Sequence, residues 1–141
     1  MKWLFILLFP MCVRAQDTTK HTRKGKWLQY ALLTTSVVAN AVGDGLNSRE
    51  YYAQGHALNA LSIGTLLAVP FVCKPNWKMP VNYILIRYAI FDGLYNYGAH
   101  RNLNYRGGQN YYNEGIGHVP LGVLNTTKFL SLGASILINI K

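Results

Sequence analysis

Acidic residues are scarce in this sequence of 141 residues. There are only 5 Asp and Glu against 14 Lys and Arg, and all charged residues together make up 13% of the chain. A globular protein usually has about 25% charged residues, and a soluble surface needs at least as many. The chain is 50% hydrophobic, which is too apolar for a disordered protein. The scarcity of charge therefore points to residence in a membrane.

Cysteine is also scarce, with Cys12 and Cys73 as the two in the sequence. This number excludes a small secreted scaffold held together by several disulfides. If the N-terminal segment is removed, Cys73 alone remains, so we expect no intramolecular disulfide and assign Cys73 to packing. The chain is also too short for several domains.

The N-terminus has the pattern of a secretory signal. Lys2 precedes an apolar run over residues 3–13, and Ala15 is a small residue at its end. As a helix this run would measure about 16 Å, which is too short for about 30 Å of hydrocarbon. We predict a signal peptide over residues 1–15 with cleavage after Ala15. A short uncleaved anchor is the alternative.

Residues 16–26 form a polar, basic arm, and residues 27–141 are predicted to form one helical membrane domain. The first three apolar segments of this domain have 17 residues each, about 25 Å as helices, at the lower limit of transmembrane length. We therefore predict an all-α fold, a small membrane bundle of three to four apolar helices. The four apolar segments are residues 27–43, 57–73, 81–97 and 120–140.

A β-barrel is the alternative fold, because residues 132–141 alternate between larger apolar residues and small or polar ones. Every strand of a barrel must alternate in this way, and the other segments do not. The helical prediction is therefore preferred.

The basic residues leave the orientation open. Lys74 and Lys78, between the second and third segments, lie on the same side of a two-helix hairpin as the arm over residues 16–26. The positive-inside tendency would place both in the cytoplasm. A cleaved signal would instead carry the arm to the opposite side.

Polar residues within or beside the apolar segments are informative because ionisable groups in a membrane are costly. Asp92, Asn96 and His100 follow one another at intervals of four and would share one helix face. His56 and Asn59 open the second segment three residues apart. We predict that these side chains meet at one level of the bundle and tie two hairpins together. The candidate polar cluster consists of Asp44, His56, Asn59, Asp92, Asn96 and His100.

Two cations interrupt the apolar segments. Arg87 lies in the middle of the third segment, five residues before Asp92, so the two do not share a helix face. We expect Arg87 to pair with a carboxylate elsewhere, such as that of Asp44, or to extend to the interface. Lys128 divides the fourth segment, which would then lie in the interface or pack as an ordinary core element.

The two acidic positions share local sequence, because residues 44–47 read DGLN and residues 92–96 read DGLYN. This similarity predicts two related helical hairpins, since membrane folds often contain internal repeats. The alternative is that both stretches simply close helices, because Asp and Asn beside Gly are common at helix ends.

The carboxylates and imidazoles could in principle bind a metal or transfer protons, but no pair has a recognised ligand spacing. Because an unpaired polar group in lipid is costly, we expect these side chains to bond to one another and hold the helices together. We therefore predict no catalytic residue and no cofactor, and leave metal binding open. A binding or transport site and catalysis are the alternatives.

The sequence resembles a group of small bacterial or phage-encoded membrane-associated proteins over roughly residues 38–140. The resemblance implies membrane association and no particular activity. The matching features are Asp44-Gly45, Gly55-His56 with Asn59, Phe91-Asp92 and Tyr95-Asn96.

We therefore expect a small exported or inner-membrane helical protein with a structural or interaction role in a bacterial cell envelope. A holin-like or channel-forming permeability element is one alternative, and a membrane-embedded hydrolase or ligand-binding protein is another. The expected partners are the lipid membrane and a second copy or an envelope protein. The scattered basic residues and the absence of a recognisable reading helix argue against nucleic acid.

Overall fold

The computed structural model describes residues 23–72, 76–105 and 119–140. Within these ranges the chain is helical and contains no strand, so the all-α prediction is confirmed. The predicted signal peptide and most of the basic arm lie outside the described residues. The helices are α2 (Arg23–Asn47), α3 (Tyr52–Val72), α4 (Lys78–Gly98) and α6 (Leu121–Ile140).

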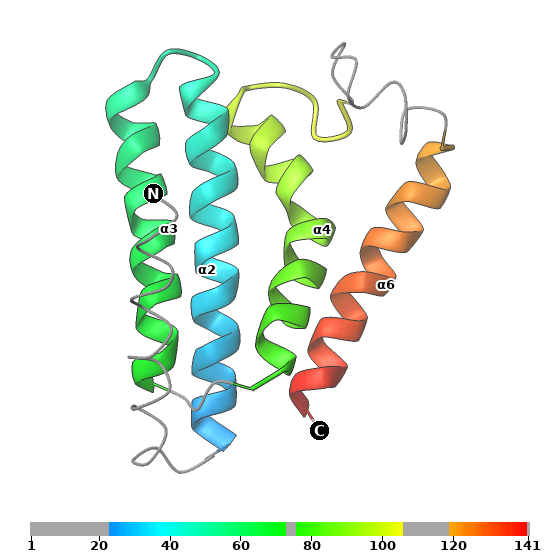
Figure 1. The fold of residues 1–141 in the computed structure, drawn as a ribbon. Helices are drawn as coiled ribbons and strands as arrows, with labels where there is room; N and C mark the ends of the chain where they lie inside the picture. The colour runs from blue at the N-terminus through cyan, green and yellow to red at the C-terminus, as the bar shows by residue number, and fades with distance from the viewer. Residues whose placement is uncertain (1–22, 73–75, 106–118, 141) are drawn as a thin grey trace.

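The helices lie side by side and run alternately up and down (Figure 1). α2 packs between α3 and α4, and α6 lies on the other side of α4 (Figure 1). We call the end where α2 turns into α3, at Tyr51, the Tyr51 end. The opposite end, where Trp77 precedes α4, is the Trp77 end, and it also holds the start of α2 and the end of α6.

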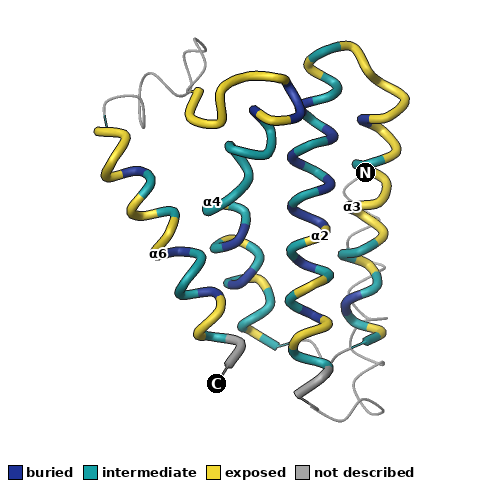
Figure 2. The backbone as a smooth tube through the Cα atoms, turned by 180° about the vertical axis from the view of Figure 1, so that it is seen from behind, coloured by how far each residue is buried: buried dark blue, intermediate teal, exposed yellow. Residues whose placement is uncertain are grey.

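The main cluster of buried apolar side chains among the described residues lies between α2, α3 and α4. Its four members are each at most 1% exposed: Leu33, Val37, Val69 and Ile86. Figure 2 shows buried positions along α2 and many exposed ones along α3 and α6. Much of the remaining buried interior is polar: Gln29, Ser36, Ser62, Asn82, Asn96, Ser131 and Ser135.

Glycines bring α2 close to both neighbours. A Cβ atom on Gly43 would lie only 2.8 Å from the carbonyl oxygen of Gly55 on α3. A Cβ atom on Gly98 of α4 would lie 2.6 Å from the carbonyl oxygen of Val42 and 3.3 Å from the Cα of Gly45. Small residues allow such close approach of helix backbones in apolar surroundings. These positions therefore set how near α3 and α4 come to α2.

These contacts correct the predicted end of the first helix. The first apolar segment predicted from the sequence ends at residue 43 and the second begins at residue 57, but α2 continues to Asn47 and α3 begins at Tyr52. Gly43 and Gly45 lie inside α2 and do not end it. They are positions at which α2 contacts α3 and α4. Asp44 is therefore held on a helix between two packed neighbours.

The C-terminal alternation does not form a strand, because residues 132–140 belong to α6. Its buried positions are Leu124, Ser131 and Ser135, with Lys128 partly buried between them. This spacing of three to four residues is the helical period and marks the face toward α4.

Two helices are long and apolar enough to cross a membrane, Tyr52–Val72 and Leu121–Ile138. Only 17% and 11% of the positions in these stretches are buried inside the protein. The core helix of a soluble protein would be mostly buried, whereas these two helices present most of their apolar side chains outward. Among the described helices, α2 and α4 do not meet the same criterion.

Candidate functional site

The predicted site residue Asp44 belongs to a network that joins three helices, which we call the Asp44 network (Asn40, Asp44, Asn59 and Arg87). The amide nitrogen of Asn59, on α3, donates to Oδ1 of Asp44 at 2.9 Å. The amide nitrogen of Asn40, one turn before Asp44 on α2, donates to Oδ2 of Asp44 at 3.2 Å and to Oδ1 of Asn59 at 3.3 Å. Both carboxylate oxygens therefore accept a hydrogen bond.

Arg87 connects this network to α4. Its Nη1 donates to Oδ1 of Asn40 at 2.7 Å, and its guanidinium lies over the ring of Phe91, 4.0 Å from the centroid. The Asn40 side chain thus accepts from the cation and donates to the carboxylate. The guanidinium of Arg87 and the carboxylate of Asp44 therefore bond to the same amide, that of Asn40. The two opposite charges lie in one network without forming a direct ion pair.

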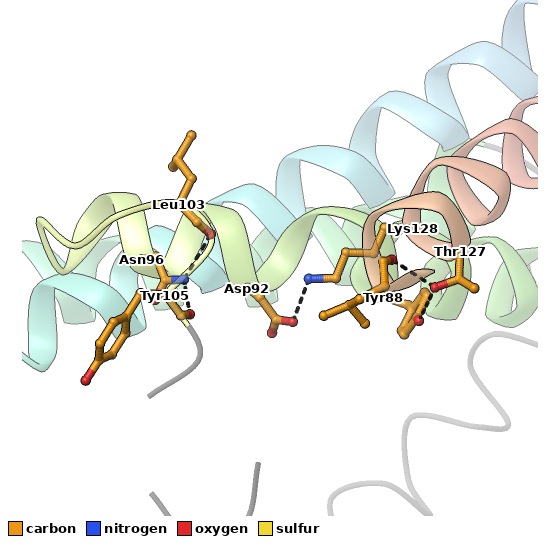
Figure 3. Close-up of polar contacts among 8 residues, drawn as sticks. Tyr88, Asp92, Asn96, Leu103, Tyr105, Thr127 and Lys128 are labelled. Carbon is orange, nitrogen blue, oxygen red and sulfur yellow. Dashed lines mark hydrogen bonds and ion pairs between the residues drawn. The ribbon is translucent and has the colours of Figure 1, made fainter. Parts of the chain in front are cut away.

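The second predicted acid, Asp92, belongs to a contact between α4 and α6 (Figure 3). Its Oδ2 lies 2.9 Å from Nζ of Lys128. One turn away, the hydroxyl groups of Tyr88 and Thr127 lie 2.8 Å apart. We call these four residues the Asp92 contact. Lys128, which appears in the sequence as an interruption of an apolar segment, is held as an interhelical partner.

Each acid contacts the next described helix in the chain. Asp44 lies on α2 and bonds to Asn59 on α3, and Asp92 lies on α4 and contacts Lys128 on α6. The bond between Arg87 on α4 and Asn40 on α2 joins the two pairs of helices, and Asn40 in turn bonds to Asp44.

The other predicted site residues lie apart from these acids. Asn96 is buried, and its amide donates to the carbonyl oxygens of Leu103 and Tyr105, which fixes the chain that leaves α4. His56 is exposed at the start of α3 and stacks on Tyr52, with ring centroids 6.4 Å apart. His100 is exposed and has φ of 52° just after α4.

The chemistry of the described residues is that of interhelical bonding. They contain no group of three or more His, Cys, Asp or Glu side chains able to hold a metal ion. Further bonds join the helices along their length, since the hydroxyls of Ser36 and Ser62 lie 2.9 Å apart and Tyr30 contacts Ser135 at 3.2 Å.

The cluster predicted from the sequence does not include Asn40, Arg87 and Lys128. Asn40 and Asp44 are four residues apart and so share a helix face. The sequence predicts that Arg87 pairs with a carboxylate such as that of Asp44, and Arg87 reaches Asp44 through Asn40 and not by a direct ion pair. The partner of Lys128 depends on which helices are neighbours. Comparison with protein-family models, curated proteins and solved structures finds no match for this chain.

Proposed function

We propose that this protein is a small helical integral-membrane protein whose role in a bacterial cell envelope is structural. The observation that carries the proposal is its inverted distribution of polarity. Serine and amide side chains are buried between the helices, while Phe71, Phe129 and Leu130 are 76%, 75% and 67% exposed. Water disfavours such a surface, whereas lipid matches it.

The ends of the helices support the same placement. Exposed tryptophans, Trp27 and Trp77, lie at the Trp77 end, and exposed tyrosines such as Tyr51 and Tyr97 lie at the Tyr51 end. Tryptophan and tyrosine collect at the two membrane–water boundaries. At about 1.5 Å per residue, the 21 residues of α3 would measure about 32 Å, which matches the hydrocarbon thickness.

The structural role is supported by what the polar side chains already do. Asp44, Asn59 and Arg87 bond within the Asp44 network, and Asp92 contacts Lys128. In an apolar environment a charge is tolerated when it is paired and hydrogen-bonded. The charged groups within the helices thus serve to hold one helix against the next. Lipid and a second copy or an envelope protein are the proposed partners.

The proposal can be tested by comparing two side chains with matched exposure. Ile63 on α3 is 60% exposed and Leu103, beyond the end of α4, is 58% exposed. We would introduce Ile63→Cys or Leu103→Cys after replacing Cys12 and Cys73 with serine. A water-soluble maleimide would then be applied to both sides of lipid vesicles that contain the protein.

We expect Leu103→Cys to react rapidly and Ile63→Cys to react only after the vesicles are dissolved and the protein is denatured. The serine variant without cysteine measures the background. Equal rates for the two cysteines in intact vesicles would show that α3 faces water, and would overturn the proposal.

A further inference from the structure

The charges at the two ends of the helical array differ. α2 begins with Arg23, Lys24 and Lys26, and Lys78 is the first residue of α4. All of these positions lie at the Trp77 end (Figure 1). The acidic residues of the described chain, Asp44, Glu50 and Asp92, lie in the half toward the Tyr51 end. The Trp77 end is therefore strongly positive.

These cations do not stabilise the helices in which they lie. The N-terminus of a helix carries partial positive charge and favours acidic side chains in its first turn. Neither α2 nor α4 has an acidic residue there, and both have basic ones. Lys78 extends toward the last turn of α6, with Nζ 3.4 Å from the carbonyl oxygen of Ile138, so the negative end of that helix offsets part of the charge. An anion outside the chain would offset the rest.

Two lysines at this end, Lys26 and Lys78, stand next to an exposed tryptophan. Lys26 precedes Trp27, which is 49% exposed, and Lys78 follows Trp77, which is 70% exposed. An indole placed at the level of the lipid headgroups beside an ammonium group is the combination that anchors helix ends in an interface. The two pairs lie at the starts of two different helices at the same end.

The opposite end carries little net charge. The guanidinium of Arg49 lies over the ring of Tyr51 at 4.9 Å, and that of Arg101 lies over Tyr105 at 5.1 Å. Glu50 adds a negative charge at this end. The arginines of the Tyr51 end thus have aromatic contacts within the chain, and the net charge there is small.

From these observations we propose that the Trp77 end is a surface that binds the headgroups of anionic phospholipids, with Lys26 and Lys78 as the contacting cations and Trp27 and Trp77 as the anchors. This inference rests on the proposed membrane location. A cluster of juxtamembrane cations attracts anionic lipid, and the attraction weakens as salt screens the charges.

The test uses the tryptophans as reporters in the full chain. Trp3→Phe leaves Trp27 and Trp77 as the fluorescent indoles. The protein is placed in phosphatidylcholine vesicles that contain, at equal mole fraction, either brominated phosphatidylglycerol or brominated phosphatidylcholine. Bromine quenches indoles that it contacts, so the ratio of the two quenching efficiencies reports the preference for the anionic lipid.

We expect stronger quenching by the anionic lipid at low salt, and a smaller difference as sodium chloride is added. Lys26→Gln with Lys78→Gln is expected to reduce the relative association constant of the anionic lipid about fivefold for each lysine. Arg49→Gln with Arg101→Gln, at the other end, removes the same charge and is expected to leave the preference unchanged. Circular dichroism would confirm that both double variants keep their helix content.

Equal quenching by the two lipids in the parent protein would overturn the proposal, as would an equal loss of preference in both double variants. Flotation of the vesicles separates this failure from failure of the membrane proposal. A protein that floats with the vesicles but shows no preference is a membrane protein without this surface, whereas one that stays at the bottom of the gradient contradicts both proposals.

Discussion

Arg87 reaches Asp44 through Asn40. Nη1 of the arginine donates to the amide oxygen of Asn40 at 2.7 Å, and the amide nitrogen of Asn40 donates to Oδ2 of Asp44 at 3.2 Å. One neutral side chain thus separates the cation from the carboxylate and bonds to both. The amide of Asn40 also donates to Oδ1 of Asn59 on α3. The same side chain thus bonds to both neighbours of α2, which are α3 and α4.

Removal of this amide is expected to be costly. Asn40→Ala would leave the guanidinium of Arg87 without its acceptor and take one donor from Asp44, and a lost hydrogen bond to a charged group costs about 1.5–3 kcal/mol. We therefore expect the free energy of unfolding to fall by at least about 2 kcal/mol, measured by circular dichroism during denaturation from detergent micelles. Asn104→Ala, at an exposed position, is the control and should change the value by less than about 0.5 kcal/mol. A similar effect of both substitutions would contradict this reading of Asn40.

The contact between Asp92 and Lys128 should tolerate exchange of its charges. Lys128→Met or Asp92→Leu alone leaves one charge facing an apolar side chain, and we expect a loss of about 1–3 kcal/mol in either case. Asp92→Lys combined with Lys128→Asp restores opposite charges 36 positions apart in the sequence. The exchange should recover more than half of that loss in the same denaturation measurement. If the double variant is no more stable than the single ones, the ion pair does not hold α4 to α6.

The close approach of α2 and α4 predicts a steric effect that depends on position. Gly98→Ala would place a Cβ atom 2.6 Å from the carbonyl oxygen of Val42, so the helices must separate, and overpacking of this kind costs about 1–3 kcal/mol. Gly64 on α3 has no atom within 4 Å of its would-be Cβ, and Gly64→Ala should be neutral or stabilise by up to about 1 kcal/mol. The two free energies of unfolding, compared under one set of conditions, give the test. Equal changes would show that the helices are not in tight contact at Gly98.

The existence of the helices could be predicted from the sequence, but their neighbours could not. Apolar segments of 17 or more residues predict helices, because such runs are too long for strands and the pattern depends only on residues close in the sequence. The partner of Lys128 is 36 positions away and that of Arg87 is 47 positions away, so both depend on how the helices are arranged. A lysine inside an apolar segment therefore looked like an interruption of the helix, when it is a contact between helices.

The same limit applies to the candidate residues themselves. His56 and Asn59 both lie near the start of α3, but their surroundings differ. Asn59 bonds to Asp44 on α2, while the His56 side chain is exposed. Residues three positions apart on a helix share a face only approximately. Which of the two side chains contacts a neighbour depends on where α2 packs against α3. The first apolar segment predicted from the sequence likewise stops at residue 43, because the close contacts of Gly43 with α3 and of Gly45 with α4 cannot be inferred from the sequence.

These two candidates give a matched comparison on one helix. His56→Ala should leave the free energy of unfolding within about 0.5 kcal/mol of the parent, because the side chain is exposed. Asn59→Ala removes the 2.9 Å donor of Asp44 and should cost about 1.5–3 kcal/mol. If the His56 variant keeps its stability but no longer supports the function of the protein in cells, His56 has more than a structural role. That result would favour ligand binding.

The antiparallel order of the helices also predicts which segments share a side of the membrane. Lys26 and Lys78, near the starts of α2 and α4, lie at the Trp77 end. Leu103 lies at the Tyr51 end, where its carbonyl oxygen accepts from Asn96 near the end of α4. In the background that lacks Cys12 and Cys73, an impermeant maleimide added to one side of sealed vesicles should therefore react with Lys26→Cys and Lys78→Cys together, and with Leu103→Cys only from the other side. Labelling of Lys26→Cys and Leu103→Cys from the same side would show that the array does not cross the bilayer as proposed. Mass spectrometry of the cellular protein adds the direction, because cleavage after Ala15 would place the Trp77 end on the exported side, against the positive-inside tendency.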